Sequence, residues 1–493
     1  MWISELITTD IIDTWRGNSR ILIKASCGTG KTRFITGNFY EGANQNNKKI
    51  LILNNRRFLK QQTEKECEGK EDTITIMTYQ SLEQNLDYAN RVLREHDYIV
   101  ADEAHYFFND SVLNNSTSYR LMSLLKQVDR PVIFMTATPE VLERWMTFND
   151  ENTFDIQKPP QVDKFYYFRN PAAIGSLLKL IPPDEKIIYF CSDLRRMEEL
   201  YNQHKEYSMF VCSESQKNYY NKYVDKVAVE NEIVGEETFS KRILFVTSAL
   251  DNGVNFKDKN IKHIICDYAD ITTVIQCIGR KRYDGDDDTI NLYIMDYTQE
   301  KLNGRIGLMN EFFQRISNIR NLSSVEYAQK YESNYYHNGL ILGTDENGNF
   351  RFIPKSSVQL KYQYDLELYN EIFNRYDNRH FVKCICDKLG LENTMPISLE
   401  KEYDNQKIAE LFNEMKDKKL FDEDIENIKN FFQNDLMDGC PRRSKGGINQ
   451  YLSEKELYYY YIESKQEKSY ADGNRDKTYW MLKINWEAVG EAG

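Results

Sequence analysis

Short apolar runs alternate with longer polar segments over the first 155 residues. The runs are rich in Ile and Val, and they cover residues 21–25, 49–53, 72–77, 97–102 and 131–137. Their length and composition are typical of buried strands, whereas the segments between them, such as 56–68, have helical spacing. The alternation predicts a parallel sheet built from strand–helix–strand units.

The same pattern appears a second time further along the chain. A polar stretch over 149–161 ends near a proline pair and predicts a linker. Beyond it, apolar runs recur at 186–192, 207–212, 242–248, 261–267 and 289–296. The predicted fold class is therefore α/β, with two tandem parallel-sheet domains over 1–155 and 162–300.

Residues 301–493 have a different character, with helical stretches rich in Tyr, Asn, Lys and Glu. They predict a mainly α-helical accessory C-terminal region. Asn347-Gly348 suits a tight turn and predicts one hairpin within it. The tyrosine run over 458–462 predicts helix packing and core, with base stacking as the alternative, and Trp480 and Trp486 predict core anchors of a closing strand.

Composition and charge narrow the function classes only slightly. No apolar run is long enough for a membrane span, and the start of the chain has no basic segment followed by an apolar block, so we expect a cytoplasmic protein without membrane contact. The nine cysteines lack paired zinc spacing, and Cys384 and Cys386 predict buried thiols. The net charge of −12 argues against a wholly basic nucleic-acid coat but leaves room for a local positive groove.

The clearest chemical motif follows the first apolar run. It consists of Ala25, Ser26, Cys27, Gly28, Thr29, Gly30, Lys31 and Thr32. A glycine-rich turn between a strand and a helix lets backbone N–H groups approach phosphates, and the helix N-terminus adds a favourable dipole. Lys31 is placed to reach the β- and γ-phosphates of a nucleotide, and Thr32 to ligate Mg²⁺.

A second motif ends the strand predicted at 97–102. Asp102 and Glu103 begin the sequence Asp-Glu-Ala-His, which His105 completes. A carboxylate at the C-terminal end of such a strand lies beside the phosphate loop. We expect Asp102 to hold Mg²⁺ through water and Glu103 to polarise the attacking water.

Together these motifs resemble those of superfamily 2 helicases and translocases of the DEAD/DEAH-box type. The resemblance implies two RecA-like domains, ATP and Mg²⁺ as ligands, and nucleic acid as the partner. Thr136 and Thr138 resemble the motif that couples hydrolysis to movement, with His105 at the domain interface. Arg57, Thr78 and Ser81 resemble the residues that contact the nucleic-acid backbone.

The second half of the chain continues the resemblance. Thr247, Gly253 and Asn255 resemble motif five, in which Gly253 would approach the nucleotide and the other two the nucleic acid. Gln276, Arg280 and Arg282 resemble motif six, which supplies arginine fingers across the domain cleft. Position 283 is Tyr where the family has its second arginine, so Arg280 is the safer finger and Arg282 a substitute one place early.

Two further features have plain interpretations. Asp286, Asp287 and Asp288 predict an exposed turn rather than a metal site. The cationic stretch 440–447 fits either a solvated loop or a phosphate grip.

The resemblance leaves three functions open. The first is an ATP-driven helicase or translocase on DNA, in replication, repair or phage and mobile-element biology, which the departures of motifs five and six from the RNA group favour. The second is an RNA helicase. The third is a non-unwinding motor that remodels or loads a partner protein through residues 301–493.

Overall fold

The computed structural model describes most of the chain and divides it into two compact units. The described residues are 2–26, 28–112, 116–212, 219–247, 254–331, 339–344, 348, 350–375, 380–440, 443–468 and 476–485. The main unit comprises residues 1–164 and 182–394, and the small unit comprises 165–181 and 395–493. The predicted three-part division stays a prediction, because the region after residue 300 is divided between the two units.

Domain 1, at the start of the main unit, is built on a parallel sheet with strand order β3-β2-β4-β5-β1-β6. Its strands are β1 (Arg20–Ala25), β2 (Ile50–Asn54), β3 (Ile74–Thr78), β4 (Tyr98–Asp102), β5 (Val132–Thr136) and β6 (Thr153–Ile156). Five of them coincide with the predicted runs within two residues. The sixth corrects the predicted linker, because Phe154 and Ile156 alternate inward and pair the segment with β1.

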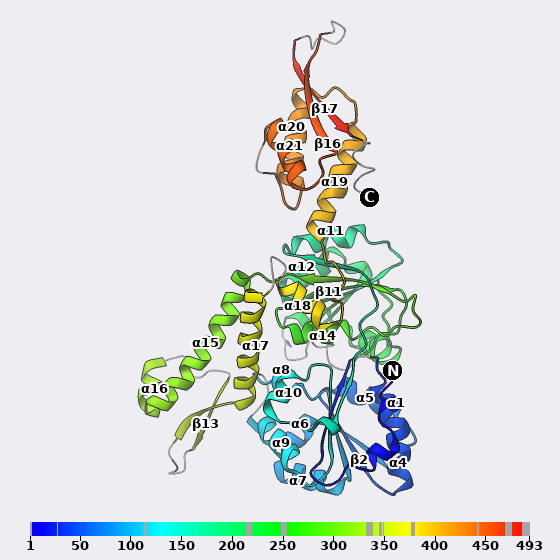
Figure 1. Ribbon diagram of the computed structural model, residues 1–493, viewed down its shortest axis with the longest axis vertical. Helices are drawn as coiled ribbons and strands as arrows, with labels where there is room; N and C mark the ends of the chain where they lie inside the picture. The colour runs from blue at the N-terminus through cyan, green and yellow to red at the C-terminus, as the bar shows by residue number, and fades with distance from the viewer. Residues whose placement is uncertain are drawn as a thin grey trace. The chain divides into compact units, whose positions relative to one another are not determined.

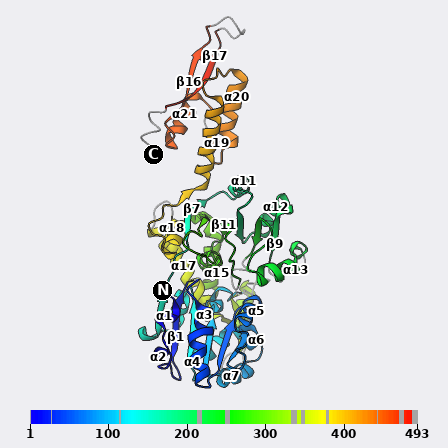
Figure 2. The same ribbon diagram turned by 90° about the vertical axis from the view of Figure 1, so that its right-hand side faces the viewer.

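Helices cover both faces of this sheet, as Figures 1 and 2 show. One apolar core joins one sheet face to α6 (Tyr79–Glu83), α7 (Leu86–Glu95), α8 (Tyr106–Asn109), α9 (Ser116–Gln127) and α10 (Glu140–Trp145). A second core joins the other face to α1 (Ile3–Leu6), α2 (Thr9–Ile12), α3 (Lys31–Phe34) and α4 (Tyr40–Gln45). Helix α5 (Arg57–Glu66) packs against β2 and β3.

Domain 2 repeats this construction with strands in the order β12-β11-β8-β10-β9, all paired in parallel. The strands are β8 (Lys186–Cys191), β9 (Ser208–Val211), β10 (Ile243–Val246), β11 (Ile261–Asp267) and β12 (Ile290–Met295), with helices α12 (Leu194–Gln203), α13 (Lys226–Ala228) and α14 (Ile271–Ile278). The predicted α/β class with two tandem RecA-like parallel-sheet domains is confirmed.

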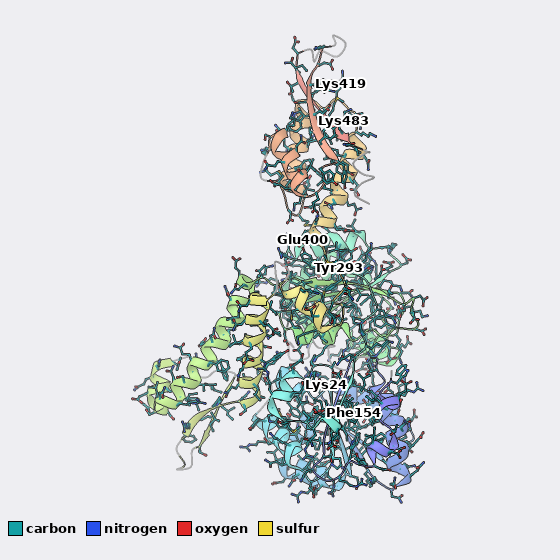
Figure 3. All side chains as sticks on the ribbon, in the orientation of Figure 1. Lys24, Phe154, Tyr293, Glu400, Lys419 and Lys483 are labelled. Carbon is teal, nitrogen blue, oxygen red and sulfur yellow. The ribbon has the colours of Figure 1, made fainter. Side chains whose placement is uncertain are left out.

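Two polar side chains of domain 2, His263 and Asp288, are buried. His263 lies on β11. Its Nδ1 atom is 3.1 Å from the hydroxyl of Tyr293, which is labelled in Figure 3, and its Nε2 atom is 2.6 Å from Glu185 Oε2. Asp288 was predicted to be exposed, but it is 2% exposed and accepts a 2.5 Å hydrogen bond from Lys281 Nζ. The exposed-turn prediction is therefore wrong for Asp288, since the nearby lysine compensates its buried charge.

The rest of the main unit is a helical arm with one hairpin. It consists of α15 (Gln299–Asn321), α16 (Ser324–Tyr331), β13 (Leu340–Thr344), β14 (Phe350–Pro354), α17 (Ser356–Arg375) and α18 (His380–Lys388). Helices α15 and α17 lie side by side in Figure 1, and the antiparallel pairing of β13 with β14 confirms the predicted hairpin. Asn347 of its turn lies outside the described residues.

The small unit combines two segments that are far apart in the sequence, residues 165–181 and 395–493. Its elements are β7 (Val162–Phe168, which begins in the main unit), α11 (Ala172–Leu180), β15 (Ile397–Ser398), α19 (Leu399–Met415), α20 (Asp422–Asn430), α21 (Lys445–Glu454), β16 (Tyr460–Gln466) and β17 (Thr478–Ile484). Glu400, labelled in Figure 3, accepts hydrogen bonds from the backbone N–H groups of Arg169 and Asn170 at 2.6 and 2.8 Å. Ion pairs of Lys419 with Glu467 and Lys483 with Asp417 stabilise the region around the hairpin.

The hairpin β16–β17 corrects one prediction in this unit and agrees with another. The tyrosine run leads into β16 rather than a helix: Tyr458, which precedes the strand, is exposed, and Ile462 within the strand is buried. Trp480 is buried in the core as predicted, while Trp486 lies outside the described residues. In the described part of the chain, no helix has both the length and the apolarity needed to cross a bilayer.

Candidate active site

The loop between β1 and α3 requires glycine at two positions. Gly28 has a φ of +82° and Gly30 a φ of +88°, both in the left-handed region that side chains disfavour. Gly30 is the residue before α3, so the loop leads directly into a helix N-terminus. This is the backbone geometry that presents N–H groups to phosphate.

Side chains at the base of the loop fix its path. Thr29 Oγ1 donates to the Ser26 carbonyl at 2.7 Å, and Ser26 Oγ accepts from the Lys158 N–H at 2.7 Å. Ala25, where such loops usually have glycine, is fully buried as the last residue of β1. Cys27 lies outside the described residues.

The acidic pair follows β4 and faces this loop. Asp102 Oδ1 accepts the Glu103 N–H at 3.0 Å, and Glu103 has a φ of +48°, a strained conformation for a residue with a side chain. Burial raises the pKa of Asp102 to about 6, with the Glu103 carboxylate adding to the effect and Lys31 opposing it. Tyr79, missed by sequence reasoning, donates from its hydroxyl to the Asp102 carbonyl at 2.8 Å.

Glu103 is the electrostatic centre of the site. It is 4% exposed, and its Oε1 lies 3.2 Å from Lys31 Nζ and 3.5 Å from Arg280 Nη2 of domain 2. Burial favours the neutral acid, but Lys31, His105 and Arg280 outweigh that effect and hold the pKa of Glu103 well below its usual range. Glu103 is therefore a carboxylate that pairs cations from both domains.

A row of polar side chains continues from Glu103 across the two domains. His105 Nδ1 lies 3.5 Å from Glu103 Oε2 and 3.1 Å from Thr136 Oγ1, which accepts the Thr138 N–H at 3.1 Å. Thr138 Oγ1 in turn accepts from Gln276 Nε2 at 3.4 Å. All of these residues are at least nine-tenths buried, so the row is a continuous series of polar contacts shielded from water.

The phosphate loop, with Lys31, borders a cavity of about 600 Å³. Its lining includes Gly28, Gly30, Lys31 and Thr32 from domain 1 and Asn255, Gly279 and Arg282 from domain 2. Trp2 also lines it, as do residues 387–390 of the arm. A cavity of this size suits a nucleotide, since ligand pockets occupy about 300–1,000 Å³.

The remaining candidates from motif six and motif five lie on domain 2. Arg282 donates to Asn255 Oδ1 and to the Gly279 carbonyl, and it borders the cavity, while Tyr283 lines the cavity beside it. Thr247 is half-buried at the end of β10. Gly253 lies outside the described residues.

The candidates for nucleic-acid contact on domain 1 are engaged locally. Thr78 Oγ1 accepts the Ser81 N–H at 3.2 Å, and Ser81 Oγ donates to the Thr78 carbonyl at 2.7 Å, so both side chains cap α6. The Arg57 side chain lies outside the described residues. Contacts of these residues with nucleic acid stay predictions.

Sequence reasoning missed three contributors to the cavity. Glu66 and Thr32 both line the cavity, and burial raises the pKa of the Glu66 carboxyl. Trp2 packs over the Arg33 guanidinium at 5.6 Å, and the residues around Gly390 come from the far end of the arm. A short-motif search could not find them, because each lies outside the strand ends that carry the motifs.

The site offers oxygen ligands suited to Mg²⁺, namely the Thr32 hydroxyl and the Asp102 carboxylate. Among the described residues, no group of three or more His, Cys, Asp or Glu side chains is arranged to hold a metal alone. The eight described cysteines are all buried and none of them forms a disulfide, Cys384 and Cys386 included.

Comparison with known families agrees with this geometry. Residues 3–141 match ResIII, the family described as Type III restriction enzyme, res subunit. The match spans the phosphate loop, the acidic pair and the Thr136–Thr138 segment.

Solved structures similar to this chain include three of Dbp5 from S. cerevisiae. Dbp5 bound to RNA and ADP BeF₃ is 16% identical, with 58% of this chain and 81% of that chain covered and a TM-score of 0.41. A point variant of Dbp5 with the same ligands is 17% identical, with the same coverage and a TM-score of 0.42. The same variant bound to a Gle1 variant and IP6 is 15% identical over 60% of this chain and 82% of that chain, with a TM-score of 0.38. No curated protein matches the sequence.

Proposed function

We propose that this chain is an ATP-driven nucleic-acid motor, a helicase or translocase that acts on DNA. One observation carries the proposal: Glu103 pairs with Lys31 of the phosphate loop and with Arg280 of domain 2 beside one cavity. A hydrolytic site shared by two domains lets each turnover change how the domains contact each other.

In this proposal, the residues of domain 1 bind the nucleotide and activate the attacking water. Lys31 and the loop N–H groups hold the β- and γ-phosphates, and Glu103 orients the attacking water. Thr32 and Asp102 would hold Mg²⁺ together with phosphate oxygens. When bound, the ion neutralises negative charge on the phosphates.

Domain 2 supplies Arg280, with Arg282 as a second cation, to the charge that develops during phosphoryl transfer. Lys31 and Arg280 both pair with Glu103, so an incoming triphosphate competes with Glu103 for both cations. The row from His105 through Thr136 and Thr138 to Gln276 then couples the phosphate site to domain 2.

The choice of DNA rests on two considerations. Motifs five and six depart from the RNA group, and the matching family is named for a restriction enzyme subunit. An RNA helicase, or a motor that loads a partner protein through residues 301–493 without separating strands, would use the same ATP site. The proposed grips on nucleic acid are Arg57, Thr78 and Ser81 on domain 1 and Thr247 and Asn255 on domain 2.

The test is ATP hydrolysis by the full chain with Mg²⁺ and, in turn, no polymer, single-stranded DNA, duplex DNA and single-stranded RNA. We expect DNA to stimulate hydrolysis most and Lys31→Ala to abolish it. A strand-separation assay on a partial DNA duplex follows with the same preparations.

Each outcome selects among the candidates. Stimulation by RNA alone contradicts the DNA assignment, and hydrolysis that survives Lys31→Ala contradicts the site. DNA-stimulated hydrolysis without strand separation favours translocation or partner loading over unwinding.

A further inference from the structure

Helix α17 of the arm contacts both domains that form the ATP site. It packs against α8 and α10 of domain 1 and against α15 and α18 of the arm. Its buried side chains follow helical spacing and so share one side of the helix: Val358, Lys361, Tyr364, Asp365, Tyr369 and Ile372. Two buried charges on an otherwise apolar stripe need partners on the neighbouring elements.

On the domain 1 side, α17 is anchored beside the coupling motif. Tyr364 belongs to the apolar core of domain 1, and Arg144 of α10 stacks over its ring at 5.1 Å. Arg144 also pairs with Glu367 at 2.6 Å. Helix α10 begins at Glu140, two residues after Thr138, so α17 is fixed to the element that follows the coupling motif.

On the domain 2 side, α17 holds the start of α14. Lys361 Nζ lies 3.0 Å from Oδ1 of Asp270, the residue that precedes the helix. Tyr369 donates from its hydroxyl to the carbonyl of Ala269 at 3.0 Å. Two contacts from one helix therefore fix two consecutive residues before α14.

The ionic contact is part of a charge-balanced group of four, in which Lys361 and Asp365 are buried while Asp270 and Arg305 are partly exposed. Lys361 also pairs with Asp365 at 2.5 Å, and Asp365 pairs with Arg305 at 3.3 Å. Burial opposes ionisation of Asp270, but Lys361 and Arg305 hold its pKa at about 2. The buried Lys361 needs a carboxylate on each side to compensate its charge, so its contact with Asp270 has a defined geometry.

The other end of α14 carries the residues that reach the ATP site. Gln276 lies on the helix and Arg280 follows it by two residues, with contacts at 3.4 Å to Thr138 and 3.5 Å to Glu103. Both distances are at the outer limit of a hydrogen bond. A helix of eight residues is about 12 Å long and moves as a rigid piece, so a shift at Asp270 reaches Arg280.

We propose that Lys361 is a positioning residue for ATP hydrolysis, which sets the place of Arg280 by holding Asp270 at the opposite end of α14. The inference rests on the proposed function and extends it to the arm. Helix α17 of the arm then transmits movement between the coupling motif and the arginine finger Arg280. Any ligand that moves the arm therefore changes the rate of ATP hydrolysis.

The experiment compares the full-length wild-type protein with Lys361→Met and Lys361→Met/Asp270→Asn. For each we measure kcat and KM for ATP with stimulating polymer, affinity for N-methylanthraniloyl-ADP, and the thermal midpoint. Lys361→Met should lower kcat by about 10- to 100-fold, the usual effect of a small misplacement of a catalytic group. KM and the affinity for the ADP analogue should change less than about threefold, because the phosphate loop is untouched.

The double variant separates positioning from simple stability. Lys361→Met removes the partner of the Asp270 carboxylate and so lowers the thermal midpoint. The double variant keeps the balanced Arg305–Asp365 pair and should recover most of the lost thermal stability. We expect kcat of the double variant to remain low. Recovery of kcat together with the midpoint would overturn the inference.

Arg315→Met is the matched control. Arg315 is a buried cation of the same arm whose ion pair with Glu311 lies within α15, and its loss should lower the midpoint but leave kcat within about twofold. Unchanged kcat in Lys361→Met overturns the inference alone. Absence of hydrolysis in the wild-type protein would overturn the proposed function as well.

Discussion

Replacing Glu103 by Gln should tighten ATP binding while it slows hydrolysis and destabilises the protein in the absence of nucleotide. Glu103 is the carboxylate that balances Lys31 and Arg280. The substitution keeps the shape of the side chain but removes its charge. Two largely buried cations are then short of an anion, which the phosphates of ATP can supply.

The distances give the size of the effect. At 3.2 Å from Lys31, with an effective dielectric constant of about 20, the attraction is about 5 kcal/mol before desolvation is subtracted. Breaking one buried pair costs about 3–5 kcal/mol in proteins, and some water reaches the Lys31 side chain, so we expect a loss of about 3 kcal/mol. If domain 1 unfolds by itself, as a domain of about 150–250 residues, this lowers its thermal midpoint by about 6–12 °C.

The assay is calorimetry with and without ATP, together with ATP titration and steady-state hydrolysis. Glu103→Gln should gain at least about tenfold in ATP affinity, equal to about 1.4 kcal/mol of the lost pairing. The matched control is Glu83→Gln, a buried glutamate of domain 1 that bonds Tyr106, which should leave ATP affinity unchanged. The reasoning is refuted if Glu103→Gln binds ATP no tighter than wild type with an unchanged midpoint.

Three further predictions concern conformation, pH and the core. Gly30→Ala should lower the thermal midpoint more than Gly28→Ala. Both glycines have a positive φ, but only at Gly30 would the added Cβ meet Trp2, at 2.8 Å. In a Trp2→Ala background, the two substitutions should lower the midpoint by more similar amounts. Burial lowers the pKa of His263, so the unfolded chain takes up its proton first and stability falls as pH drops below about 6.5. Urea unfolding of His263→Gln between pH 7.5 and 5.5 should show a weaker pH dependence than wild type. Ile188→Ala, at a fully buried position of β8, should lose about 2–5 kcal/mol in the same assay, and a loss below about 1 kcal/mol would contradict the core assignment.

The sheets and the phosphate loop were predictable because local signals specify them. Buried parallel strands need apolar runs such as 49–53, and a loop with two positive-φ positions needs Gly28 and Gly30. The placement of Glu103 between Lys31 and Arg280 follows once both domains are recognised. Each of these signals lies within a few consecutive residues.

The arm was beyond sequence reasoning because its contacts are long-range. Lys361 meets Asp270 some 90 positions earlier in the chain, and nothing in the sequence around either residue indicates the pairing. Asp288 lies in a run of three acids that reads as solvated, and only the fold brings Lys281 to it. The tyrosine run at the start of β16 is uniformly aromatic, so its pattern of apolar positions cannot distinguish a strand from a helix.

The central claim is that ATP binds to domain 1 and is hydrolysed only with Arg280 of domain 2. The most direct measurement is kcat for ATP beside affinity for N-methylanthraniloyl-ADP in Lys31→Ala and Arg280→Gln. The account predicts that Lys31→Ala loses both binding and turnover, while Arg280→Gln retains affinity within about threefold and loses turnover by about 10³-fold or more. Near-normal turnover in Arg280→Gln would contradict it.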